Sequence, residues 1–237
     1  ASFQAFVCGM RVYPSRQLPV QPFQIFNSLA YDQFAARWKR ARNLQRNPSL
    51  FILATMITLL IGTNRPQSNT RKIARHIEGV YSELKLPLNI VDLAKLPPEI
   101  FNPESYAEKP KAFQPFADAI LQSSGLVLIT PEYNGGIPGV LKYFIDMLKF
   151  PESFDRRPVC FVGLGAGVWG ALRPVEHLQQ IFAYRNAYVY PERVFFPKVN
   201  ELLDDNGRLK DPELLTRLQS QAKGFVSFVE RLRGSKL

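Results

Sequence analysis

The sequence predicts an α/β fold in which helices cover both faces of a parallel sheet. Short apolar runs, typical of strands buried on both faces, occur at residues 57–61, 126–130 and 158–162. Each run is followed by a polar or glycine-rich stretch and then by apolar residues at helical spacing. Strands that alternate with helices in this way indicate a parallel sheet with its crossover helices on both sides.

The first predicted strand, 57–61, leads into a loop of hydrogen-bonding side chains. Residues 62–70 read Gly-Thr-Asn-Arg-Pro-Gln-Ser-Asn-Thr, and Ser68 or Asn69 is a good N-cap for the helix that follows. The free amides and the dipole of a helix N-terminus attract anions. We therefore expect a phosphate to bind here. An ordinary capped loop is the alternative interpretation.

The middle of the chain predicts a binding corner. A second strand is expected at 88–92, a proline-rich loop at 95–110 and a helix around 111–123. The third strand then ends in a polar elbow at 131–136, and a helix follows over 138–148. A strand, a polar elbow and a helix in succession are typical of a ligand-binding corner of a parallel sheet.

The fourth strand is followed by glycines in a recognisable pattern. Gly165, Gly167 and Gly170 satisfy the G-x-G-x-x-G dinucleotide fingerprint between a strand and a helix. Residues 188–190 and 194–196 are strand-like on either side of Pro191. The last helix is expected to begin at Asp211-Pro212, where a capping acid precedes a proline at the first helical position.

The net charge of +10 lies mostly before the first predicted strand. Residues 1–55 carry seven Lys or Arg and one acid, which leaves +4 for residues 56–237. We predict that 56–237 is one cofactor-binding domain and that 1–55 is a basic extension. Three interpretations of the extension remain: a non-functional leader before a second start at Met56, an Arg-rich transit peptide, and, least favoured, a nucleic-acid contact.

The composition excludes several classes of protein. Two cysteines, Cys8 and Cys160, rule out a disulfide framework, and no His, Cys, Asp or Glu cluster has metal-ligand spacing. No apolar run is long enough to span a bilayer. His76 and His177 are expected on helix surfaces, since neither has an acid or Cys at ligand spacing. We therefore assign no catalytic side chain and expect a bound cofactor to carry the chemistry.

Two cofactor arrangements compete. If the glycines at 165–170 bind a dinucleotide, their loop should be the first strand–helix turn of its unit, yet only some 67 residues follow it. If the 62–70 loop binds a monophosphate, the loops after strands one, three and four surround one pocket of a doubly wound, five-stranded sheet of order 2-1-3-4-5. We prefer the second arrangement because it uses all three loops.

Three segments in this order resemble the NAD(P)H-dependent FMN reductase family: GTNRPQSNT at 62–70, PEYNGGIPGVLK at 131–142 and GLGAGVWGALRPVEHLQQ at 163–180. The resemblance covers 56–233 and implies a flavodoxin-like fold, FMN as cofactor and NAD(P)H as co-substrate. That family includes bacterial quinone and chromate reductases, so the acceptor implied is a quinone, a free flavin or a similar small molecule. It also implies a homodimer or homotetramer, with the helix over 138–148 as a candidate contact.

The resemblance also implies which residues hold the cofactor. The 62–70 loop would cradle the FMN phosphate, the elbow would border the ribityl chain and ring, and the glycine loop would lie at the other edge of the ring. The residues implied are Thr63, Arg65, Ser68, Asn69, Thr70, Pro131, Glu132, Tyr133, Asn134, Gly135, Gly165, Ala166, Gly167 and Trp169. The family commonly has Ser at position 63, Asn at 70 and His at 135; the first two changes keep hydrogen-bonding capacity, and the third leaves the acceptor open.

Two other functions compete with this interpretation: a flavodoxin-type electron carrier without nicotinamide turnover, and a Rossmann NAD dehydrogenase that uses Gly165, Gly167 and Gly170. Carriers of the first type are typically acidic, and the net charge of +10 argues against one. A cytoplasmic location is expected. A transit peptide at 1–55 would make it organellar, and Ser235-Lys236-Leu237 matches a peroxisomal address that chance also explains.

Overall fold

The structure is a computed structural model and describes residues 55–234. The predicted basic extension, apart from residue 55, lies outside the described residues. The C-terminal tripeptide Ser235-Lys236-Leu237 lies outside them as well.

One parallel sheet organises the described part of the chain. It contains β1 (Ile57–Ile61), β2 (Asn89–Asp92), β3 (Gly125–Pro131), β4 (Pro158–Leu164), β5 (Tyr188–Val189) and β6 (Val194–Phe196). The order is β2-β1-β3-β4-β5, and β6 also pairs with β4, so the predicted order is confirmed. The fifth position is split into two short strands around Pro191, which has no N–H to donate to a ladder.

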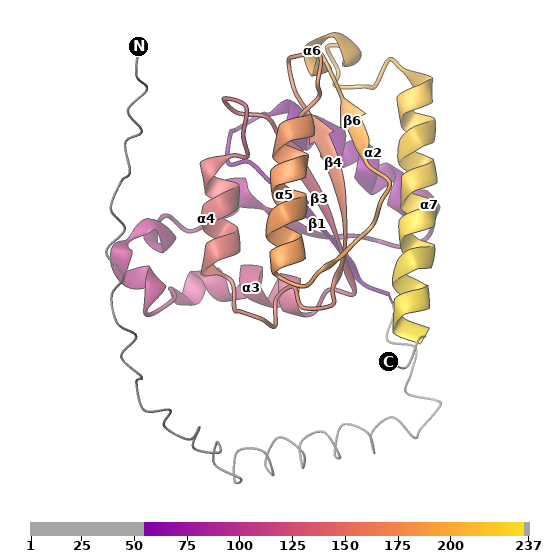
Figure 1. Cartoon of the computed structure of the whole chain (residues 1–237). Coiled ribbons are helices and arrows are strands. Elements are labelled where there is room, and N and C mark those ends of the chain that lie inside the picture. Colours follow the sequence, from indigo (N-terminus) through magenta and orange to yellow (C-terminus); the bar gives the residue numbers. More distant parts are fainter. Residues whose placement is uncertain (1–54, 235–237) are drawn as a thin grey trace, which may run out of the picture. The chain divides into compact units, whose positions relative to one another are not determined.

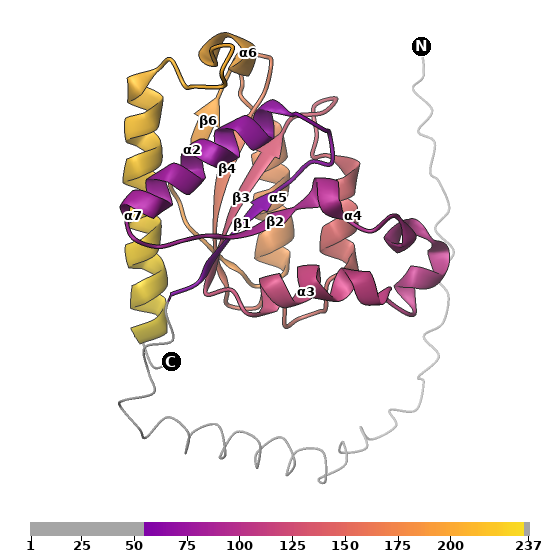
Figure 2. The ribbon, with the colours of Figure 1, turned by 180° about the vertical axis from the view of Figure 1, so that it is seen from behind.

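Helices cover both faces of the sheet (Figures 1 and 2). On one face lie α2 (Asn69–Glu83) and α7 (Pro212–Gly234), and on the other α3 (Gln114–Leu121), α4 (Gly139–Met147) and α5 (Leu172–Tyr184). Successive strand residues point to opposite faces. Leu59 belongs to the core under α2 and α7, while Leu60 belongs to the core under α3, α4 and α5.

Short 3₁₀ helices occupy Pro98–Phe101 and Pro103–Tyr106 within the proline-rich stretch predicted as a loop at 95–110. Two more flank it, Leu93–Lys95 before it and Lys111–Phe113 at the start of the helix predicted around 111–123. Part of the proline-rich stretch packs on α4. The Tyr143 hydroxyl donates to the Ile100 carbonyl at 2.7 Å, and the Tyr143 ring lies 5.0 Å from Phe101 and 5.7 Å from Tyr106 between centroids. Met147 is buried. The broad apolar surface of α4 is therefore covered in part by its own chain and is not in itself evidence of a subunit contact.

The C-terminal part contains one predicted and one unpredicted helix. α7 begins as predicted, with Asp211 Oδ1 accepting from the Glu213 and Leu214 amides at 2.8 and 3.3 Å. The unpredicted α6 (Val199–Leu202) follows Lys198, whose φ of 46° turns the chain sharply. No helix within residues 55–234 is long and apolar enough to cross a membrane.

Candidate functional site

The loops after β1, β3 and β4 meet at the carboxyl edge of the sheet and surround a cavity of about 500 Å³. Parallel pairing places the strand ends side by side, with Ile61 opposite Ile129 and Pro131 opposite Leu164. The structure brings together at the cavity wall the predicted residues Arg65, Ser68, Asn69, Thr70, Pro131, Glu132, Tyr133, Gly165 and Ala166.

The β1 loop presents free hydrogen-bond donors to one end of this cavity. Ser68 is the N-cap of α2, and its Oγ accepts from the Arg71 amide at 3.3 Å. Within residues 55–234, the backbone amides of residues 67–70 have no hydrogen-bond acceptor. The exposed Arg65 adds a cation to the same wall. These amides, the α2 dipole and a guanidinium make this end suited to an anion.

Arg71 is a different kind of cation. Its guanidinium pairs with the carboxylate of the buried Asp92 at the end of β2. Asp92 in turn caps the turn that follows β2 by accepting from the Ala94 amide at 3.1 Å. Arg71 therefore fixes α2 against the sheet, and Arg65 is the basic side chain in the cavity lining.

Thr63 was predicted as a phosphate contact but does not line the cavity. Its side chain is buried, and its Oγ1 lies 2.7 Å from the Tyr133 hydroxyl. The same Oγ1 accepts from the Arg65 amide at 3.2 Å. Thr63 therefore shapes the β1 loop from behind and joins it to the elbow after β3.

The elbow after β3 is a tight turn. Tyr133 and Gly136 exchange backbone hydrogen bonds of 3.0 Å, and Asn134 and Gly135 have φ of 51° and 74°. Two successive positive φ values over an Asn-Gly pair are typical of a type I′ turn. The Gly136 amide is thereby occupied, whereas those of Asn134 and Gly135 have no acceptor in the described residues. Asn134 and Gly135 lie beside the cavity lining, outside it.

The glycine loop after β4 packs against the chain after β6. Gly165 donates its N–H to the Phe196 carbonyl at 3.1 Å and accepts from the Val199 amide at 3.0 Å. The Gly167 carbonyl accepts from the Lys198 amide at 3.0 Å. Gly170 has a φ of 57°, and a Cβ there would lie 2.8 Å from the Pro197 nitrogen.

These contacts contradict the dinucleotide interpretation of the three glycines. The Gly165 N–H, which a pyrophosphate would need, is already bound to protein, and Gly170 serves close backbone packing. Of the predicted residues in this loop, Gly167 and Trp169 lie outside the cavity lining. The Trp169 side chain is 61% exposed.

Five lining residues were not predicted: Pro66, Gln67, Leu164, Val199 and Asn200. Three of them flank predicted positions. Val199 and Asn200 come from α6, whose four residues carry no periodicity that a sequence pattern would reveal. Asn200 Oδ1 accepts from Asn69 Nδ2 at 2.8 Å, which joins α6 to the first residue of α2.

The described residues that line the cavity include no histidine that could act as a general acid or base. His76 Nε2 lies 2.9 Å from the Gly207 carbonyl on the outer side of α2, and His177 is exposed on α5. Among residues 55–234, no group of His, Cys, Asp or Glu could hold a metal ion. The free amides at one end and small backbone groups at the other fit a phosphate-bearing cofactor.

The sheet order and the cavity at its switch point define a flavodoxin-like fold with a ligand site at the carboxyl edge of its sheet. A family model described as NADPH-dependent FMN reductase matches residues 55–201, and the chain belongs to this family. It is an NAD(P)H-dependent flavoenzyme.

Curated relatives agree with this assignment. The chain is 29% identical over 153 residues to the NAD(P)H-dependent FMN reductase PA1204 of Pseudomonas aeruginosa, covering 63% of this chain and 82% of that protein. It is 28% identical over 184 residues to a quinone reductase of Escherichia coli K12, covering 75% of this chain and 96% of the other.

Solved structures share the fold. FerB, a flavoenzyme NAD(P)H:(acceptor) oxidoreductase from Paracoccus denitrificans, superposes with a TM-score of 0.62 at 22% identity, covering 75% of this chain and 98% of its own. The apo form of the NADH:FMN oxidoreductase EMOB superposes with a TM-score of 0.59 at 14% identity, covering 78% of this chain and 92% of its own.

Proposed function

We propose that this protein passes a hydride from NAD(P)H through bound FMN to a quinone, a free flavin or a similar small acceptor. The observation that carries the proposal is the two-ended cavity at the carboxyl edge of the sheet. One end offers free amides and Arg65, and the other is bordered by Pro131, Tyr133 and the glycine loop. The FMN reductase and quinone reductase names of the relatives support the same activity.

The phosphate would bind at the N-terminus of α2. The unpaired amides of residues 67–70 and the Arg65 guanidinium together offer donors that suit the oxygens of a phosphate dianion. Ser68 holds this end of α2 in place as its N-cap. Thr63 and Tyr133 hold the β1 loop against the elbow through their 2.7 Å contact.

The ring system would lie against the elbow and the glycine loop. When bound, FMN accepts a hydride from NAD(P)H and passes the electrons to the acceptor. Pro131 and Glu132 form one wall, and Gly165 and Ala166 add little bulk on the other. The unpaired amides of Asn134 and Gly135 are donors available to negative charge on the ring, which is electrostatic stabilisation by preorganised groups.

Absorption spectroscopy and turnover test this function together. Purified full-length protein should be yellow or take up added FMN, and it should oxidise NADH or NADPH when a benzoquinone is present. Rapid bleaching of the flavin on mixing with NADPH distinguishes a reductase from an electron carrier. A colourless protein that takes up no FMN and oxidises neither nicotinamide would contradict the proposal.

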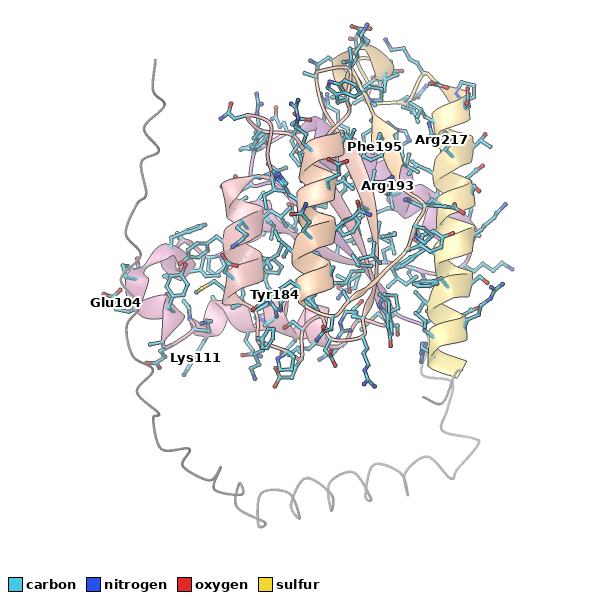
Figure 3. All side chains as sticks on the ribbon, viewed as in Figure 1. Glu104, Lys111, Tyr184, Arg193, Phe195 and Arg217 are labelled. Carbon is cyan, nitrogen blue, oxygen red and sulfur yellow. The ribbon has the colours of Figure 1, made fainter. Side chains whose placement is uncertain are left out.

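We also propose that the protein is a homodimer or homotetramer through the outer side of α5 and the end of α4. Phe150, just after α4, and Tyr184, the last residue of α5, are 61% and 77% exposed, and Tyr184 lies at the lower end of α5 in Figure 3. Phe150 and Tyr184 also line a hollow of about 450 Å³ between these helices. Exposed aromatic groups of this kind are typical of interaction surfaces. Light scattering of the wild type and of Tyr184→Arg tests the assembly, since a monomeric wild type would contradict it.

Location within the cell is a separate proposal. We propose a cytoplasmic protein, and the organellar and peroxisomal alternatives depend on residues 1–55 and 235–237. Imaging of chains that carry a fluorescent protein at either end tests all three.

A further inference from the structure

We infer that Asn200 on α6 is a specificity-determining contact for the phosphate of the cofactor. The inference rests on the proposed FMN site and deepens it. Asn200 lines the same cavity as Ser68, Asn69 and Thr70, although it follows them by some 130 residues in the chain.

The hydrogen bond between Asn69 and Asn200 leaves the side-chain amide nitrogen of Asn200 without a partner in the described part of the chain. Its Oδ1 is engaged by Asn69 Nδ2 at 2.8 Å. The Nδ2 of Asn200 has no acceptor among residues 55–234. A side-chain amide carries two N–H donors on that nitrogen, so the group left for a ligand is a pure donor. Next to the free amides of residues 67–70, it extends the donor set around the same anion.

The position of Asn200 is held from two sides. The Val199 amide donates to the Gly165 carbonyl at 3.0 Å, which fixes the start of α6 on the glycine loop. Further along, the Gly207 carbonyl lies 2.9 Å from His76 Nε2, which attaches the next turn to α2. These contacts fix the backbone on both sides of Asn200, and the hydrogen bond to Asn69 orients its exposed side chain toward α2.

A phosphate contact predicts that Asn200 distinguishes FMN from riboflavin, which lacks the phosphate. The Asn200→Asp variant keeps an acceptor for Asn69 but replaces the donor with a negative charge. Its affinity for FMN should fall about tenfold or more, because like charges repel at short range. The Asn200→Ala variant should lose about three- to tenfold, the usual net value of one hydrogen bond, because Asn200 lies at an exposed position. Riboflavin affinity should change less than about twofold in both.

The matched control is Asn186→Asp, which adds the same charge at the opposite edge of the sheet. Asn186 follows the C-terminal end of α5 and has a φ of 57°, a conformation that Asp tolerates. Affinities for FMN and riboflavin are measured by quenching of flavin fluorescence, at low salt and at about 1 M salt, where the Debye length is near 3 Å. The loss in Asn200→Asp should shrink at high salt, whereas the loss in Asn200→Ala should persist. Thermal unfolding without flavin checks that each variant is folded.

Three results overturn the inference. If both Asn200 variants bind FMN as tightly as the wild type does, Asn200 does not contact the phosphate. If they lose the same affinity for FMN and for riboflavin, Asn200 has only a structural role. In either case, normal FMN binding by the wild type leaves the proposed function intact. A wild-type protein that binds neither flavin overturns both proposals.

Discussion

The hydroxyls of Thr63 and Tyr133 lie 2.7 Å apart and join the loops after β1 and β3. Thr63 is buried, and Tyr133 lines the cavity, so the contact runs from the interior to the wall of the site. Because the Thr63 Oγ1 also accepts from the Arg65 amide, the two loops form one hydrogen-bonded unit. A change on either loop is therefore expected to disturb both.

The Tyr133→Phe variant removes this contact and keeps the ring. We expect a loss of about 1 kcal/mol in the free energy of unfolding, the usual net value of a partly buried hydrogen bond. FMN affinity should fall as well, because the β1 loop is less firmly held. Urea unfolding and fluorescence titration measure the two effects. The control is Tyr188→Phe, because the Tyr188 hydroxyl makes no hydrogen bond within residues 55–234. Equal behaviour of the two variants would refute the link between the loops.

Arg65 is expected to act on the cofactor and not on the fold. Because its side chain is exposed, Arg65→Ala should change the free energy of unfolding by less than about 0.5 kcal/mol. FMN affinity should fall about tenfold or more at low salt, since charge-assisted hydrogen bonds to phosphate are strong. Arg75→Ala, on the exposed side of α2, removes the same charge and should bind FMN normally. If both variants lose affinity equally, the effect is only one of net charge.

Gly170 and Gly167 make a matched pair in one loop. At Gly170 an added Cβ meets backbone atoms at 2.8 Å and the φ of 57° disfavours side chains, whereas at Gly167 the Cβ would meet nothing within 4 Å. We expect Gly170→Ala to cost about 3 kcal/mol, and to lower the melting temperature by roughly 8 °C. Gly167→Ala should lie within about 1 kcal/mol of the wild type. Calorimetry distinguishes them, and similar melting temperatures would show that this loop does not pack as described.

Burial raises the pKa of the Cys160 thiol well above its ordinary value of 9.0. At a pH slightly above 9, the Cys160 thiol therefore stays protonated in the native state, whereas it is deprotonated in the unfolded chain. The stability contributed by the neutral thiol is complete below pH 9 and is lost as the pH rises from the unfolded toward the native pKa. Because the thiolate is the nucleophile, iodoacetamide at pH 8.5 should leave Cys160 unmodified in the folded protein and label it in urea. Peptide mass spectrometry measures this, and rapid labelling of the native protein would contradict the burial.

Local patterns predicted most of the architecture. β1, β3 and β4 are continuous apolar runs, and such runs indicate strands buried on both faces wherever they occur. The N-cap at Ser68 and the start of α7 at Asp211 depend on hydrogen bonds within a few residues, so neighbouring side chains are enough to predict them. The 3₁₀ helices Pro98–Phe101 and Pro103–Tyr106 were predicted as loop because proline favours both a loop and a short turn.

The candidate site, too, was predictable only where its residues lie close together in the chain. The stretches at 62–70 and 131–136 could be read from the sequence because their turn and cap residues lie together in the chain. Gly165-x-Gly167-x-x-Gly170 suggested two different cofactor arrangements, and the bond from the Gly165 amide to the Phe196 carbonyl decided against the dinucleotide. That contact spans 31 residues and has no counterpart in a local pattern.

The sequence by itself determined the type of each major element, the order in which strands and helices alternate, and the presence of a donor-rich loop before α2. Each of these depends on periodicity and capping within one segment. Only the tertiary structure decided that Thr63 turns toward Tyr133, that Arg71 pairs with Asp92, and that α6 brings Asn200 to the cavity. Those outcomes depend on which distant segments pack together, and packing contacts between segments leave no periodic trace in the chain that forms them.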